Sequence, residues 1–176
     1  MQTRLWPFRR RIDKRTSEHS GAFFELVGMV TLSWALMEMA WDLANELIME
    51  HAGGHTIEPH LPASLTRKLS FTKKAHARLD VLAPHTPVAT KLIEGVAALK
   101  EKRHDLIHGF VDEHTPEGFR DVIRLRHEGP VLGYEKRRYS VEDLKTLNIE
   151  IVALAKVARD YALGLAQQFG SRDPTL

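Results

Sequence analysis

Residues 20 to about 51 carry apolar side chains on two neighbouring seams of one predicted helix, and this pattern limits the fold more than any other feature. Both seams advance in steps of three or four residues, which is the spacing of one face of an α-helix. The first seam is Phe23, Val27, Val30, Trp34, Met37, Trp41, Ala44 and Ile48, and the second is Met29, Leu32, Leu36, Ala40, Leu43 and Leu47. A helix with two apolar seams needs partners on two sides. We therefore expect one seam to face the core and the other to meet a second protomer.

This helix is not expected to cross a membrane, because Glu25, Glu38, Asp42, Asn45 and Glu46 interrupt it. No signal peptide is expected either, since no apolar run follows the first charged residues. The absence of cysteine excludes disulfides, thiolate metal sites and cysteine nucleophiles. A length of 176 residues, 43% of them hydrophobic, fits one globular domain. We expect a cytoplasmic protein with no membrane partner.

Three more helices are predicted along the chain. Two lie at about 63–80 and 86–108, and the last opens at Ser140-Val-Glu-Asp143, which has the pattern of a capping box. Between them, residues 119–127 and 131–139 alternate with period two, and Gly129-Pro130 predicts the turn of a β-hairpin. The expected fold class is all-α, a four-to-five-helix bundle with an inserted β-hairpin at about 119–139.

The predicted domain spans residues 20–169 and is flanked by two segments outside the bundle. Residues 170–176 should form a frayed tail, and residues 1–19 a basic, flexible arm. Residues 1–20 hold six Lys or Arg against two acidic residues, although the whole chain has a net charge of only +2. Such an arm could hold phosphates, or it could be a solvated tail that aids solubility.

Arg103 is the least expected residue of the third predicted helix. On a helical wheel its side chain falls at the centre of an apolar arc about 100° wide, and the polar residues of the helix, including Asp105, are expected on the far side. An unpaired buried guanidinium is costly. We therefore expect Arg103 to be paired internally or to face a cleft filled by water or a ligand.

Three interpretations of this helix end remain open. His104 and His108, four residues apart, share a helix face and could bind a metal, although the sequence offers no third ligand. Arg103 could instead be structural, tied to a carboxylate of another helix. In the third interpretation, Arg103 and His108 are catalytic. They lie about 140° apart on a straight helix, so this interpretation needs a second protomer or a distorted helix end.

The segment Arg103-His-Asp-Leu-Ile-His108, followed by Gly109, resembles the motif of the HEPN superfamily, an arginine and a polar residue followed a few positions later by histidine. His104 stands where that family often has asparagine, and a predicted hairpin follows where many members continue in helix. The resemblance covers residues 20–169, and only the six-residue motif is specific. The resemblance implies a helical homodimer that handles RNA. Catalytic members of the family are metal-independent endoribonucleases with a cleft at the dimer interface.

The resemblance also implies roles for three residues. His108 would act as general base or acid on the ribose 2′-OH and the leaving oxygen, which suits a side chain whose unperturbed pKa is about 6.5. Arg103 would hold the scissile phosphate and offset the charge that develops on it. His104 would take the polar supporting role. No cofactor or metal is implied. Alternatively, the chain is a non-catalytic RNA- or protein-binding module of the same family, in which the motif is structural.

The predicted hairpin is rich in arginine and could follow a phosphate backbone. These candidate RNA-binding residues are Arg120, Arg124, Arg126, Arg137 and Arg138. Charge on the outer face of a hairpin also serves solubility and protects strand edges. A further hypothesis is that the chain is a toxin whose basic arm contacts a neutralising partner protein.

Overall fold

A computed structural model describes residues 14–112, 118–128 and 131–170 of the chain. It is mostly helical, with a small antiparallel sheet between the third and fourth helices. The helices are α1 (Lys14–His51), α2 (Leu65–Arg78), α3 (Thr86–His108) and α4 (Val141–Phe169). The strands are β1 (Phe110–Asp112), β2 (Phe119–Glu128) and β3 (Val131–Ser140). Short 3-10 helices follow α1 and α2, at Gly54–Thr56 and Asp80–His85.

The helix bounds agree with the sequence pattern at most ends. The capping box at the start of α4 is confirmed, because the Ser140 hydroxyl accepts from the Asp143 backbone N–H while the Asp143 carboxylate accepts from the Ser140 N–H. Helix α1 begins at Lys14, inside the segment expected to be a flexible arm. The rest of that arm, the Gly129-Pro130 turn and the tail from residue 171 lie outside the described residues.

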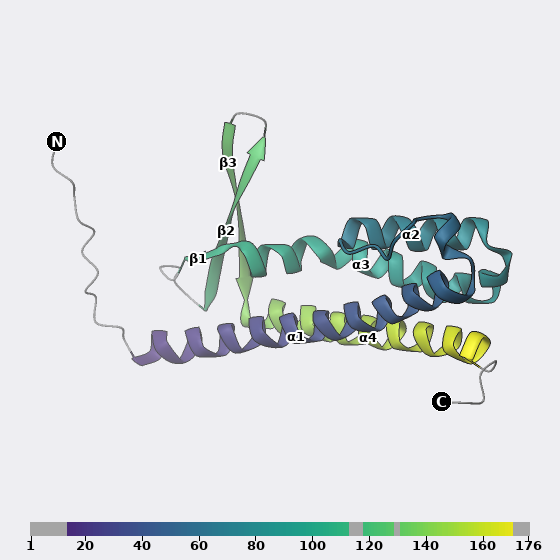
Figure 1. The fold of residues 1–176 in the computed structure, drawn as a ribbon. Helices are drawn as coiled ribbons and strands as arrows, with labels where there is room; N and C mark the ends of the chain where they lie inside the picture. The colour runs from purple at the N-terminus through teal and green to yellow at the C-terminus, as the bar shows by residue number, and fades with distance from the viewer. Residues whose placement is uncertain (1–13, 113–117, 129–130, 171–176) are drawn as a thin grey trace.

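The inserted sheet has three strands in the order β1-β2-β3, all antiparallel. The sequence pattern predicted β2 and β3, and β1 adds a third strand to the expected hairpin. Only Gly109 separates the end of α3 from the start of β1, so β1 connects the sheet to the C-terminal end of that helix. The ribbon of β2 and β3 crosses α3 and projects away from the helices (Figure 1).

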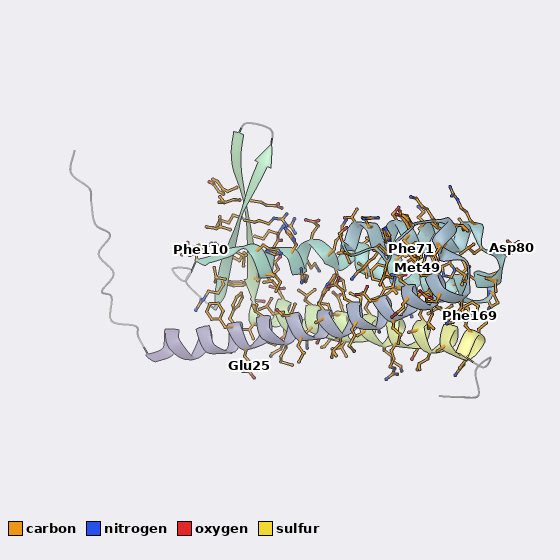
Figure 2. All side chains as sticks on the ribbon, in the orientation of Figure 1. Glu25, Met49, Phe71, Asp80, Phe110 and Phe169 are labelled. Atoms are coloured by element: carbon orange, nitrogen blue, oxygen red, sulfur yellow. The ribbon has the colours of Figure 1, made fainter. Side chains whose placement is uncertain are left out.

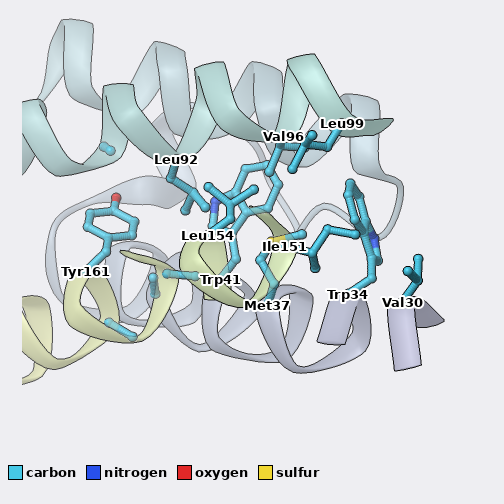
Figure 3. Close-up of a cluster of buried hydrophobic side chains, with 14 of the residues drawn as sticks. Val30, Trp34, Met37, Trp41, Leu92, Val96, Leu99, Ile151, Leu154 and Tyr161 are labelled. Carbon is cyan, nitrogen blue, oxygen red and sulfur yellow. The ribbon is translucent and has the colours of Figure 1, made fainter. Parts of the chain in front are cut away.

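Helices α1 and α4 are the two longest elements and run side by side in the same direction (Figure 1). The Ser33 hydroxyl of α1 donates to Asn148 Oδ1 of α4 at 2.9 Å, and the rings of His51 and Phe169 stack where the two helices end. Helix α3 covers this pair and runs in the opposite direction. The core between the three helices contains Trp34 and Trp41 of α1, facing α3 residues such as Leu92, Val96 and Leu99 (Figure 3).

The two seams predicted for α1 have different environments. The first seam is buried, with Val27 alone only partly so, as predicted. The second seam is divided, because Ala40 and Leu47 are partly buried against the core while its other four members are exposed. Together with Met39, which lay outside the predicted seam, these four form a row of five large side chains that are 46–66% exposed on the opposite side of α1: Met29, Leu32, Leu36, Met39 and Leu43. Their spacing of three, four, three and four residues is that of a coiled-coil seam. We call these five residues the outer face of α1. The part of the chain that the structure describes does not cover this face.

Within the described residues, the stretch Gly21–His51 of α1 is long and apolar enough to cross a membrane by length and composition alone. Core helices of soluble proteins meet the same criterion. One side of this stretch, which includes Trp34 and Trp41, is buried against the rest of the chain. That the helix does not span a membrane stays a prediction.

Candidate functional site

The candidate site lies at the C-terminal end of α3, where the helix meets the sheet. Gly109 ends the helix in an extended conformation, and its N–H donates to the Asp105 carbonyl at 2.7 Å. A Cβ at this position would collide with the Val122 side chain of β2 and with the Asp105 carbonyl oxygen. Glycine is therefore needed here because the sheet packs directly against the helix end. This contact fixes the position of the last helical turns relative to β2.

Arg103 points from α3 toward α1, where its guanidinium carbon lies 5.5 Å from the centre of the Trp34 ring. This is the distance of a cation–π contact. The Trp34 indole N–H donates to Glu38 at 3.0 Å, which fixes the ring under the arginine. Arg103 Nε is buried and has no hydrogen-bond partner among the described residues. Arg103 is thus held by an aromatic face, which was not among the environments expected from the sequence.

Asp105 is only 2% exposed, so its expected position on the polar side of α3 is wrong. Its carboxylate is bound by residues of the sheet. Arg124 Nη1 of β2 lies 3.1 Å from Oδ1, Arg137 Nη1 of β3 lies 2.9 Å from Oδ2, and the Tyr139 hydroxyl donates to Oδ2 at 3.1 Å. Burial, together with the Asp105 charge, raises the pKa of Tyr139 to about 12. Asp105 joins the motif helix to both long strands.

The basic residues of the ribbon are mostly engaged inside this junction. Arg120 and Arg124 were expected on the outer surface of the hairpin but are 3% and 8% exposed. Arg124 Nη2 also contacts Glu101 at 3.1 Å, and Arg137 Nη2 contacts Glu135 at 2.6 Å. The acidic groups of α3 and β3 thus bind Arg124 and Arg137 at the inner face of the sheet, whereas Arg120 donates to the Phe119 carbonyl.

Arg138 is the most exposed of the candidate RNA-binding arginines whose side chains the structure describes. Its Nε lies 2.8 Å from Asp121 Oδ1, and 58% of its side chain is exposed. The side chain of Arg126 lies outside the described residues. Of the five predicted phosphate contacts, Arg138 can therefore reach a ligand most directly.

His104 and His108 are exposed on α3, and their ring centres are 4.5 Å apart. Partial burial, the nearby positive charge of Arg124 and the neighbouring His108 lower the pKa of His104 from its usual 6.5. His104 therefore favours the neutral form, which can accept a proton. The structure brings the two predicted histidines together, whereas Arg103 turns toward Trp34.

Two residues at this site were missed by the sequence interpretation. Trp34 was assigned only to the apolar seam of α1, and Asp105 was placed on the solvent side of α3. Nothing local in the sequence indicates the role of Asp105, because its partners Arg124, Arg137 and Tyr139 come 19, 32 and 34 residues later in the chain. Among the described residues, no group of three or more histidines and carboxylates lies close enough together to hold a metal ion.

No family model, curated protein or solved structure matches this chain. The resemblance to the HEPN superfamily therefore depends on the motif and its helical setting, and it stays a prediction.

Proposed function

We propose that the chain is a HEPN-like, metal-independent endoribonuclease that acts as a homodimer, with Arg103 and His108 lining a cleft shared by two protomers. The observation that carries this proposal is the exposed pair of His104 and His108 at the end of a helix whose other side holds an arginine. A pair of imidazoles can supply both a proton acceptor and a proton donor near neutral pH.

The chemistry explains why a second protomer is needed. In the reaction, the 2′-oxygen loses its proton and attacks the phosphorus, the bond to the 5′-oxygen breaks, and that oxygen takes up a proton. The products are a 2′,3′-cyclic phosphate and a 5′-hydroxyl. The attacking and leaving oxygens lie on opposite sides of the phosphorus, as in other in-line displacements. Two rings 4.5 Å apart on one helix cannot reach both sides at once. The facing protomer supplies the second imidazole from its His104, and its Arg103 supplies charge to the phosphate, so each site combines His108 of one chain with Arg103 and His104 of the other.

The shared cleft also determines how the protomers meet. It requires contact between the C-terminal ends of the two α3 helices. A dimer joined only through the outer face of α1 would leave the two motif helices on separate sides, because that face is opposite the side of α1 on which Trp34 meets Arg103. The two dimers can be distinguished by complementation.

The test is cleavage of a mixed RNA pool in EDTA by the wild type, by His108→Ala, by Arg103→Ala and by an equimolar mixture of the two variants. We expect each variant alone to lose activity about 10²–10⁴-fold. In randomly re-formed dimers, half of the molecules are mixed and each has one intact shared site, so the mixture should recover about a quarter of wild-type activity. A mixture as inactive as its components would show that Arg103 and His108 act within one chain. Wild type that does not cut RNA would overturn the nuclease itself.

A second function is favoured by the environment of the motif's other residues. Arg103 stacks on Trp34 and Asp105 is buried under the sheet, so half of the motif serves the fold. A non-catalytic binding module would need only this half. In that case the wild type and His108→Ala would bind RNA or a protein partner equally well, and neither would cut RNA.

A further inference from the structure

The outer face of the sheet, on the side away from α3, carries apolar side chains that have no role in the proposed function. Strand pairing places Phe110 of β1 opposite Ile123 of β2, and Leu125 of β2 opposite Tyr134 of β3. Directly paired residues of antiparallel strands point to the same side. These four side chains therefore share the side of the sheet opposite Val122, which is packed toward α3. They form a continuous apolar strip, which we call the aromatic strip.

Three of the four side chains of the aromatic strip are among the most exposed apolar side chains of the described residues. Phe110 is 72% exposed, Leu125 64% and Tyr134 73%. Large aromatic rings held in water cost free energy unless something covers them. Phe110 is also placed next to the candidate site, since only Gly109 separates it from His108. Figure 2 shows it where α3 gives way to the sheet.

The spacing of the two rings suits a single strand of nucleic acid. Phe110 and Tyr134 are separated by two inter-strand steps and by two residues along the strands. Standard strand dimensions then place their Cα atoms about 12 Å apart. Successive bases of an extended single strand are about half this distance apart, so the rings can take two bases that flank a third. The aliphatic side chains of Ile123 and Leu125 lie between them.

Two cations border the aromatic strip on β3. Lys136 and Arg138 follow Tyr134 at intervals of two residues and so share its face. Both contact the Asp121 carboxylate, at 2.6 Å and 2.8 Å. Asp121 itself is buried, and hydrogen bonds from Arg138 and Lys136 lower its pKa to about 2. The carboxylate is thus hidden while its two partners are about half exposed, so solvent meets the positive charges. Asp112, paired with Asp121, moderates this charge.

We propose that the aromatic strip binds single-stranded RNA, with bases stacked on Phe110 and Tyr134 and the backbone held near Lys136 and Arg138. The outer face of α1 provides a contrast, because it carries only methionine and leucine and therefore fits an apolar protein surface. The strip instead combines aromatic rings with cations, as surfaces that stack single-stranded bases do. This inference rests on the RNA substrate of the proposed function, and it extends the cleft of α3 onto the sheet.

The test measures binding without cleavage. A fluorescein-labelled single-stranded oligoribonucleotide is titrated with the full chain carrying His108→Ala, in EDTA, and binding is followed by fluorescence anisotropy. Adding Phe110→Ala or Tyr134→Ala should weaken binding about 5- to 100-fold each, which is the effect of losing one stacked base. Tyr134→Phe keeps the ring and should bind within about twofold of its parent. Leu61→Ala, at another exposed apolar residue, is the matched control and should have no effect.

Salt and competitors sharpen this result. With two phosphates neutralised, the logarithm of the binding constant should fall with the logarithm of salt concentration at a slope of about −1.4. Duplex RNA of the same length should compete poorly, because its bases already stack on one another.

Unchanged binding in a folded double variant Phe110→Ala/Tyr134→Ala would overturn the inference. The inference would also be overturned if the double variant changed the oligomeric state in light scattering without changing RNA binding, because the aromatic strip would then be a protein interface. Either result leaves the proposed function standing if the wild type still cuts RNA. Conversely, tight ring-dependent binding by a chain that never cuts RNA would reject only the nuclease.

Discussion

The last two turns of α3 place neighbouring residues in opposite environments. Arg103 and Asp105 turn inward, one onto the Trp34 ring of α1 and the other beneath the arginines of the sheet. His104 and His108 turn outward and lie against each other in solvent. Asp105 holds the helix end in place, whereas the two histidines are free to meet a ligand. Arg103 packs on Trp34 but is only partly buried, so in the proposed function it combines a structural role with a chemical one.

Asp105→Ala tests the inward half most severely. Removing the carboxylate takes one acidic partner from Arg124 and one from Arg137, although both keep Glu135, and it leaves the Tyr139 hydroxyl without its acceptor. The free energy of unfolding should therefore fall by about 2–4 kcal/mol. Urea denaturation followed by circular dichroism measures the change. Asp160→Ala removes an exposed carboxylate paired with Arg159 and should cost less than about 1 kcal/mol. If the two variants were equally stable, the contacts of Asp105 would not be what joins the sheet to α3.

Gly109→Ala should have the next largest effect. The added methyl group meets Val122 and the Asp105 carbonyl, so either the sheet or the helix end must shift. We expect a loss of about 1–3 kcal/mol in the same denaturation assay. Gly21→Ala is the matched control, because its Cβ would enter open space. Adding Val122→Ala to Gly109→Ala relieves one of the two collisions, and a double variant no more stable than expected from additive losses would contradict this explanation.

Arg103→Ala separates stacking from catalysis. Loss of the contact with Trp34 should lower the free energy of unfolding by about 1–2 kcal/mol. Arg103→Lys keeps the charge but not the planar group, and it should retain only part of this stability. If Arg103 acts on RNA as proposed, activity at a temperature where both variants stay folded falls much further than this loss of stability explains. Equal losses of stability and activity would assign Arg103 to the fold alone.

His104→Ala and His108→Ala should leave stability almost unchanged, within about 0.5 kcal/mol, because both side chains are exposed. Cleavage should nevertheless be lost. The pH profile adds a check on the wild type. The pKa of His104 is lowered from its usual 6.5. Any step that needs neutral His104 should therefore persist as the pH falls through 6.5 and be lost only at a lower pH. A clear drop in the free energy of unfolding for either variant would show that the histidine has a structural role.

The sequence predicted the features that depend on local period and end signals. The buried seam of α1, the start of α4 at Ser140 and the stop of α3 before Gly109 all follow from neighbouring residues. Strand β1 has only three residues, which is too short for its period to be recognised. The inward direction of Arg120 and Arg124 was also missed, because alternation shows that a strand has two faces but not which one is covered. For Arg124 the carboxylates of Glu101 and Asp105 settle that choice, and they are distant in sequence.

The parallel pairing of α1 and α4 has a consequence for how the chain folds. Ser33 and Asn148, which join the two helices, are 115 residues apart in sequence. Bringing them together requires closure of a very long loop before the large core between the helices can form, and such contacts slow folding. We therefore expect this mostly helical protein to fold more slowly than bundles whose neighbouring helices are consecutive. The segment from α2 to the sheet has the more local contacts and should become ordered before the two ends of the chain meet.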